Sequence, residues 1–165
     1  MDTVDSYYKL CSRLRSSSAG LIAIEGFCAS GKTWLADQLG RDLPAAVIHV
    51  DDYCTPRVDP PSYVEGVDTP RLKHALRNLD STQLSVVEGI CLRVVMARCA
   101  VTAKIYVYVK RMDRNELWHD GINLEYYEAE NGIHGDDNEP HASDFYYHST
   151  KRPHEQADII FLRVE

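Results

Sequence analysis

The chain has 165 residues, 44% of them hydrophobic and 26% charged, which is typical of a single globular domain. Its formal net charge of −7 argues against sequence-independent binding to nucleic acid or to an anionic membrane, because such binding needs clustered lysine and arginine. Five scattered cysteines without a C-x-x-C pair indicate reduced thiols, and no apolar run approaches membrane-spanning length. We therefore expect one domain over residues 1–165, in the cytoplasm, with neither nucleic acid nor membrane as a partner.

The hydrophobic pattern predicts strands that alternate with helices. In chain order, we expect a helix over 3–17, a strand over 21–25, a helix over 33–43, a strand over 45–50, a proline-rich loop over 55–61, a helix over 70–79 capped by Asp68 or Thr69, and strands over 84–87, 104–109 and 159–164. The first helix is interpreted as a packing element or a homodimer contact. Continuously apolar strands that alternate with helices indicate a parallel sheet covered on both faces.

The segment that follows the first predicted strand has the spacing of a phosphate-binding loop, reading GFCASGKT. Gly26 and Gly31 let successive N–H groups turn toward one anion, and the start of the next helix adds its positive end. Lys32 can reach the β and γ phosphates, and the Thr33 hydroxyl can ligate Mg²⁺. We expect ATP and Mg²⁺ as cofactors. The residues predicted to bind the nucleotide are Gly26, Phe27, Cys28, Ala29, Ser30, Gly31, Lys32, Thr33 and Trp34.

Other classes of nucleotide-binding protein fit the sequence less well. A GTPase would normally carry D-x-x-G and N-K-x-D motifs, and neither occurs in a useful context. AAA+ and helicase-type ATPases are usually longer. A short chain with acids at the ends of two predicted strands favours a kinase for small molecules.

Those acids are the candidate catalytic and metal-binding residues. Asp51 and Asp52 end the second strand, so they face the same crevice as the phosphate loop. A carboxylate there could accept the proton of an attacking hydroxyl or bind Mg²⁺ through water, or the pair could cap a helix or lie in a solvated turn. Asp51 is favoured as the base because it follows the apolar strand directly. Glu88 closes the strand of VVEGI, where an acid can organise Mg²⁺ together with Thr33.

These motifs together resemble the uridine kinases and nicotinamide riboside kinases, a branch of the P-loop nucleoside kinases. The resemblance is carried by GFCASGKT, VIHVDDYC, GVDTP, VVEGI and EQADIIF. It implies a three-layer α/β fold with a five-stranded parallel sheet in the order 2-3-1-4-5. It also implies ATP-Mg²⁺ as the donor and a ribose hydroxyl as the acceptor.

The resemblance also assigns residues. It places the catalytic base on Asp51, the residue that holds the ribose hydroxyls on Asp68 and the acid of the E-G motif on Glu88. Tyr53 falls on the aromatic of the acceptor pocket, and Asp52 beside it is predicted to contact the acceptor. The function predicted from this set is ATP-dependent phosphoryl transfer to a nucleoside-like alcohol. A kinase for a non-nucleoside alcohol and a nucleotide-binding regulator without transferase activity remain the alternatives.

The chain departs from the family in its lid, predicted over residues 115–150, whose stretch 128–144 is polar and is expected to be a mobile loop. The family carries several arginines that clamp the transferring group. The matching stretch KRMDRNELWHDG offers Arg111 and Arg114, which are predicted to be catalytic, and Arg152 is a third candidate. Because the sequence ends just after residues 159–164, we expect the usual terminal helix and part of the adenine pocket to be absent.

Overall fold

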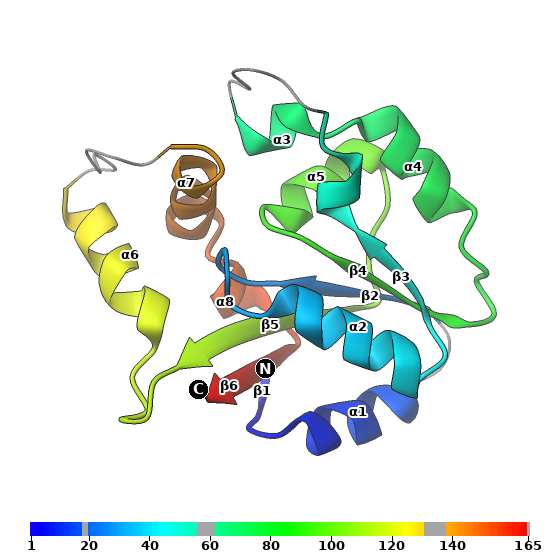
Figure 1. The fold of residues 1–165 in the computed structure, drawn as a ribbon, viewed down its shortest axis with the longest axis horizontal. Helices are drawn as coiled ribbons and strands as arrows, with labels where there is room; N and C mark the ends of the chain where they lie inside the picture. The colour runs from blue at the N-terminus through cyan, green and yellow to red at the C-terminus, as the bar shows by residue number, and fades with distance from the viewer. Residues whose placement is uncertain (18–19, 56–61, 131–137, 165) are drawn as a thin grey trace.

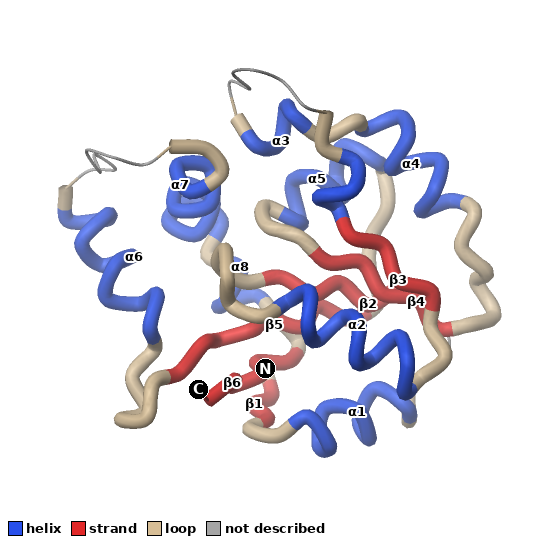
Figure 2. Tube along the Cα trace, viewed as in Figure 1, coloured by secondary structure: helices blue, strands red, loops and turns tan. Residues whose placement is uncertain are grey.

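The strands of the protein form one parallel sheet, and helices cover both of its faces (Figure 1, Figure 2). A computed structural model describes residues 1–17, 20–55, 62–130 and 138–164. The strands are β1 (Asp2–Val4), β2 (Gly20–Glu25), β3 (Ala46–His49), β4 (Leu84–Glu88), β5 (Ile105–Met112) and β6 (Ile159–Val164). The helices are α1 (Tyr7–Arg15), α2 (Lys32–Asp42), the 3₁₀ turn η1 (Val50–Tyr53), α3 (Tyr63–Gly66), α4 (Thr69–Arg77), α5 (Leu92–Cys99), α6 (His119–Ala129), α7 (His141–Lys151) and α8 (Pro153–Gln156).

The sheet has the order β1-β6-β5-β2-β4-β3, and its neighbouring strands are parallel. The five predicted strands correspond to β2 through β6, and their predicted order 2-3-1-4-5 is the observed order β3-β4-β2-β5-β6. The predicted number of strands is wrong, because β1 pairs with residues 159–161 and adds a sixth. The helix expected from residue 3 therefore begins only at Tyr7, after a segment that extends the sheet.

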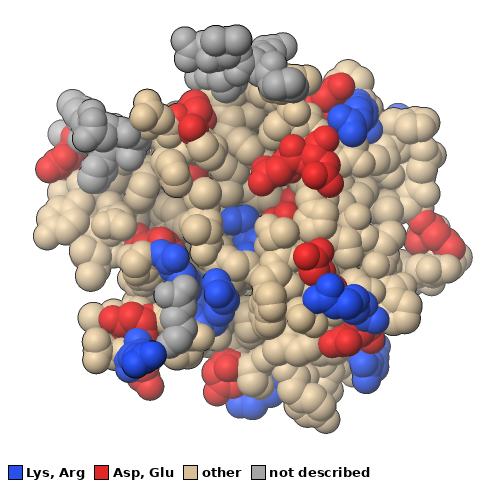
Figure 3. Space-filling model, in the orientation of Figure 1, with Lys and Arg blue, Asp and Glu red and all other residues tan. Residues whose placement is uncertain are grey.

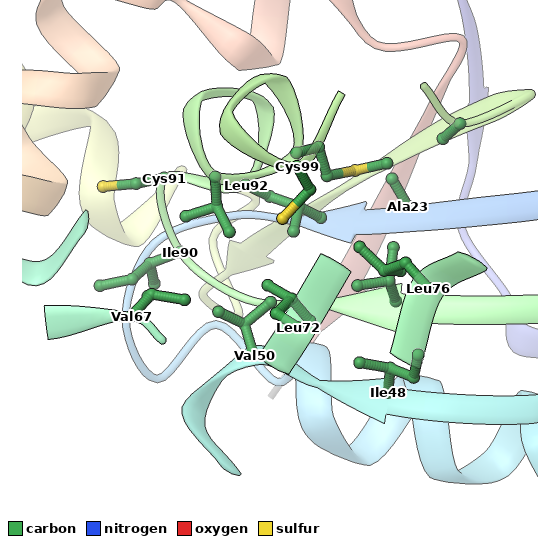
Figure 4. Packing of buried hydrophobic residues seen from close by; sticks show 14 of the residues in the cluster. Ala23, Ile48, Val50, Val67, Leu72, Leu76, Ile90, Cys91, Leu92 and Cys99 are labelled. Atoms are coloured by element: carbon green, nitrogen blue, oxygen red, sulfur yellow. The ribbon is translucent and has the colours of Figure 1, made fainter. Parts of the chain in front are cut away.

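Strand β2 shows how the layers are held together. Ile22 and Ile24 pack on one face of the sheet, among apolar side chains of α1 and α2. Ala23 lies on the opposite face because successive side chains of a strand alternate, and it joins the core beneath α4 and α5. Figure 4 shows this second core, where Leu72 of α4 and Leu92 of α5 lie near the sheet. Since helices bury both faces, the edge at which the strands end is the place for a ligand.

The predicted lid is largely helical where the structure describes it. Helix α7 packs between α6 and the phosphate loop, with the ring of Phe145 5.3 Å from Phe27 and 5.5 Å from Tyr127 between ring centroids. The prediction of a loop over 128–144 is wrong for residues 128–129 and 141–144, because these residues belong to α6 and α7. Its residues 131–137, like residues 56–61 of the predicted proline-rich loop, lie outside the described residues. None of the helices in the described ranges is long and apolar enough to cross a membrane.

Candidate active site

Residues 26–33 form a strand–loop–helix turn between β2 and α2, the conformation that phosphate binding requires. Gly26 has a φ of 153°, and a Cβ there would lie 2.7 Å from the carbonyl oxygen of Val109, so the position admits only glycine without a shift of backbone. Lys32 is 7% exposed, and its Nζ donates to the carbonyl oxygen of Phe27 at 2.6 Å. The ammonium group is thus held against the loop that would bind the phosphates.

The predicted metal-binding residues lie together. Strands β2 and β4 are neighbours, so α2 places the Thr33 hydroxyl 3.3 Å from Oε1 of Glu88, to which it donates. Nδ1 of His49 lies 2.8 Å from the same carboxylate oxygen, and its Nε2 lies 3.3 Å from Asp37 Oδ1. Burial lowers the pKa of His49, but its bond to Glu88 and the surrounding carboxylates outweigh burial, and the pKa is raised. A hydroxyl and a carboxylate are hard oxygen donors that fit Mg²⁺, and His49 orients the carboxylate.

A cavity of about 110 Å³ joins the phosphate loop to the end of β3. It is lined by Cys28, Ala29, Lys32, Thr33, Asp51, Tyr63, Glu88, Gly89, Ile90 and Pro140. A second cavity, of about 280 Å³, is lined by Asp51, Cys54, Thr55, Tyr63, Gly66, Glu139 and Pro140. Asp51, Tyr63 and Pro140 line both cavities, so the predicted base lies where the cavity at the phosphate loop meets a second binding space.

Tyr63 fixes the orientation of the Asp51 carboxylate. The Tyr63 hydroxyl donates to Asp51 Oδ1 at 2.6 Å. Burial, followed by this hydrogen bond, raises the pKa of Tyr63, so the phenol stays protonated and remains a donor. The backbone N–H of Tyr63 donates in turn to Glu139 Oε2 at 2.8 Å and Ser143 Oγ at 3.0 Å. Residues 139 and 143, which both lie in the segment that follows residues 131–137, are therefore tied to the predicted base through one tyrosine.

The charge of the site is mostly negative. Figure 3 shows a hollow near the centre of the view with a basic group inside it, and acidic side chains gathered beside it over the end of β3. Among the residues that line the smaller cavity, Lys32 carries positive charge, and Asp51 and Glu88 are acids. A triphosphate would add further negative charge, so binding a divalent cation with it is the expected way to balance the site.

The remaining predicted acceptor residues line neither cavity. Asp68 Oδ1 accepts from the backbone N–H of Arg71 at 3.1 Å and so caps α4, as its alternative interpretation expects. The ring of Tyr53 lies 4.7 Å beneath the guanidinium of Arg71. Asp52 is exposed on η1. In this structure Asp68 and Tyr53 contact Arg71 of α4. The predicted roles of Asp52, Tyr53 and Asp68 in binding an acceptor stay predictions.

The predicted lid arginines also lie away from the two cavities. Arg111, at the end of β5, forms an ion pair with Asp120, with 3.8 Å between Nη2 and Oδ1. Arg114 is exposed in the turn that follows. Sequence reasoning missed Arg163, which lies in register with Arg111 on β6 and donates to the carbonyl oxygen of Ser30 at 3.1 Å. The sequence signal that could have pointed to Arg163 is a single charged side chain near the end of a predicted apolar strand.

Helix α7 contacts the phosphate loop through two residues that sequence reasoning also missed. The backbone N–H of Cys28 donates to Oδ2 of Asp144 at 2.6 Å, and Asp144 is 1% exposed. Oδ1 of Asp144 lies 3.2 Å from Nδ1 of the fully buried His148. The ring of His148 stacks on Phe27 at 3.6 Å between centroids. Contacts that span more than a hundred residues leave no local pattern, so no sequence signal could have found them.

The sequence matches no family model and no curated protein. Among solved structures, the fold is similar to one described as a possible uridine kinase from Bacillus stearothermophilus, with a TM-score of 0.58, 20% identity, and coverage of 94% of this chain and 96% of that one. A candidate fructose transport system kinase from Silicibacter sp. TM1040 gives a TM-score of 0.47 and 18% identity, over 95% of this chain and 99% of that one. At these identities the likeness concerns the fold alone. The chain therefore has, over nearly its whole length, the parallel α/β fold of a structure described as a possible uridine kinase.

Proposed function

We propose that the protein transfers the γ-phosphoryl group of ATP to a hydroxyl group of a small, nucleoside-like molecule. The observation that carries the proposal is the position of Asp51 between two cavities. One cavity is lined by the phosphate loop and Glu88, and the other has about the size of a small organic acceptor. The uridine kinase-like motifs and the shared fold support a nucleoside-like acceptor.

Each residue has a role that follows from its chemistry. Lys32 and the loop amides would hold the β and γ phosphates. The oxygens of Thr33 and Glu88 would hold Mg²⁺, which when bound offsets negative charge on the transferring group. The Asp51 carboxylate would accept the proton of the attacking hydroxyl while the new O–P bond forms and the bond to ADP breaks. Tyr63 keeps that carboxylate oriented.

The test compares wild type with Asp51→Asn and Asp52→Asn. Nucleosides, ribosides and small alcohols are incubated with ATP-Mg²⁺, and mass spectrometry detects the gain of a phosphate. Asp51→Asn should retain ATP binding and lose at least about 100-fold in turnover, because the amide accepts no proton. Asp52→Asn separates the two neighbouring acids: Asp52 lies outside both cavities, so its turnover at saturating acceptor should fall far less than that of Asp51→Asn, and its predicted acceptor contact would change the acceptor KM. Unchanged turnover in Asp51→Asn would refute the base assignment.

A nucleotide-binding regulator without an acceptor is the second candidate. It is favoured by the contact of Asp144 with a loop amide and by the ion pair of Arg111 with Asp120. This candidate predicts tight ATP or ADP binding and no phosphorylated product across the whole acceptor panel. A single confirmed product excludes it.

If the acceptor is instead a non-nucleoside alcohol, Asp68→Asn should leave the acceptor KM nearly unchanged.

A further inference from the structure

A third pocket, of about 360 Å³, lies beside the phosphate loop at the edge where β1 and β6 end. Its lining comes from residues 5–7 after β1, from Trp34 in the first turn of α2, and from residues 161–164 in β6. The parallel pairing of β1 with β6 brings the ends of these two strands together. The segment that directly follows β1, the strand that the sequence did not predict, therefore supplies one wall of this pocket.

The pocket is continuous with the phosphate loop through two of its residues. Trp34 directly follows Thr33, the last residue of the loop. Arg163 lines the pocket, and its guanidinium donates to the carbonyl oxygen of Ser30 inside the loop. A nucleotide whose phosphates lie on residues 26–33 would therefore have this pocket within reach of its sugar and base.

The chemistry of the lining suits a flat, polar-edged ring. Trp34 is 46% exposed, so much of its indole is open to a ligand. Tyr7 packs its ring edge against the indole, with 6.0 Å between centroids and an interplanar angle of 65°. Its hydroxyl donates to Asp42 Oδ2 at 2.7 Å, which fixes the ring. Indole faces and guanidinium groups such as that of Arg163 are the groups on which nucleobases stack.

The edge of the pocket adds a hydrogen-bond acceptor. Asp5 lies there, and the hydrogen bond from Lys9, at 2.7 Å to Oδ1, lowers the pKa of its carboxyl group. An ionised carboxylate can accept from the N–H groups on the rim of a base. The pocket thus offers stacking surfaces and an acceptor, where the neighbouring loop offers donors to phosphate.

We propose that this pocket holds the base of the bound nucleotide, so that residues 5–7, between the end of β1 and the start of α1, are part of the nucleotide site. The inference rests on the proposed function for the identity of the ligand. It changes the interpretation of the N-terminal segment, which sequence reasoning treated as a packing or dimer element. It also accounts for the exposed Trp34 beside the phosphate loop.

The test measures the binding of ATP-Mg²⁺ and of tripolyphosphate-Mg²⁺ by calorimetry, because tripolyphosphate has the phosphates without the base. Trp34→Ala should weaken ATP binding by about tenfold or more, as loss of a stacking aromatic does, and leave tripolyphosphate binding unchanged. Trp34→Phe should recover part of the ATP affinity. Tyr8→Ala is the matched control, because Tyr8 is 80% exposed, neighbours Tyr7 and does not line the pocket. Its ATP affinity should equal that of wild type.

The outcomes separate this inference from the function on which it rests. If Trp34→Ala binds ATP as tightly as wild type, the base lies elsewhere and the inference is refuted, whatever the acceptor panel shows. An equal loss for ATP and tripolyphosphate also refutes it, because Trp34 would then act on the phosphates. If the expected difference is found and no acceptor is phosphorylated, the base pocket stands and the transferase proposal fails.

Discussion

Replacing Asp144 with asparagine tests whether helix α7 restrains the phosphate loop. The buried carboxylate accepts a hydrogen bond from the backbone N–H of Cys28 at 2.6 Å. Cys28 lines the same cavity as Asp51, so this amide lies at the end of the loop where transfer is proposed. A carboxylate there takes up a donor that a phosphate oxygen could use, and its charge repels an incoming triphosphate.

The expected magnitude follows from charge and hydrogen bonding. Two like charges about 4 Å apart repel by about 4 kcal/mol at an effective dielectric constant of about 20, and Mg²⁺ offsets part of this. Asparagine still accepts from Cys28, so the substitution removes the charge and keeps the shape. We expect the Kd for ATP-Mg²⁺ to fall about tenfold, equivalent to about 1.4 kcal/mol. The free energy of unfolding should fall by about 1–2 kcal/mol, because a charge-assisted bond becomes a neutral one.

Calorimetry with ATP-Mg²⁺ and ADP-Mg²⁺, together with urea denaturation, measures both effects. The gain should be larger for ATP, which carries the additional phosphate at the Asp51 end. Asp158→Asn is the matched control, because Oδ2 of Asp158 accepts from the backbone N–H of Tyr106 at 2.8 Å, and neither residue lines the cavity. That control should lose stability without gaining affinity. Unchanged or weaker ATP binding in Asp144→Asn would refute the reasoning.

Two further predictions concern stability. Arg93→Met should lower the free energy of unfolding by about 3–5 kcal/mol, because Arg93 Nε donates at 2.8 Å to the fully buried Glu25 carboxylate, which would lose its counter-ion. In urea denaturation, adding Glu25→Gln to this variant should recover part of the lost free energy. A double variant that is no more stable than Arg93→Met would contradict this prediction. Burial lowers the pKa of His154 from 6.5 to about 4, so between these values the unfolded chain binds more protons than the folded one. Stability should therefore fall by about 2–3 kcal/mol from pH 6.5 to pH 4, and the loss should be smaller in His154→Phe; identical pH profiles of unfolding would argue against this role.

The phosphate loop, Asp51 and Glu88 could be predicted because their signals are local. The spacing of Gly26, Gly31 and Lys32 specifies a turn between a strand and a helix, whatever surrounds it. Asp51 and Glu88 each follow an apolar strand, and parallel strands end at one edge of the sheet. The local sequence pattern therefore predicts that these residues lie near each other at one edge of the sheet.

Where local pattern and tertiary contact disagreed, the prediction failed. Residues 3 and 4 belong to the predicted helix over 3–17, but pairing with β6 offers residues 2–4 a sheet edge, and they form β1. Residues 141–144 belong to a polar stretch typical of a loop, yet packing of α7 on Phe27 makes them helical and buries Asp144. Burial of a polar side chain depends on a partner that the neighbouring sequence does not contain.

The 165 residues by themselves therefore predicted the phosphate loop and the acids at the strand ends, since hydrophobic periodicity and turn chemistry act over short distances. The order of the five predicted strands followed from the resemblance of these motifs to a known family. The tertiary structure alone decided what surrounds that loop. It brought α7 onto Cys28 from 116 residues away, set Arg163 beside Ser30, and closed a pocket around Trp34 with residues from the N-terminus. Those contacts join segments far apart in the chain, and their formation depends on how the layers pack rather than on any pattern within one segment.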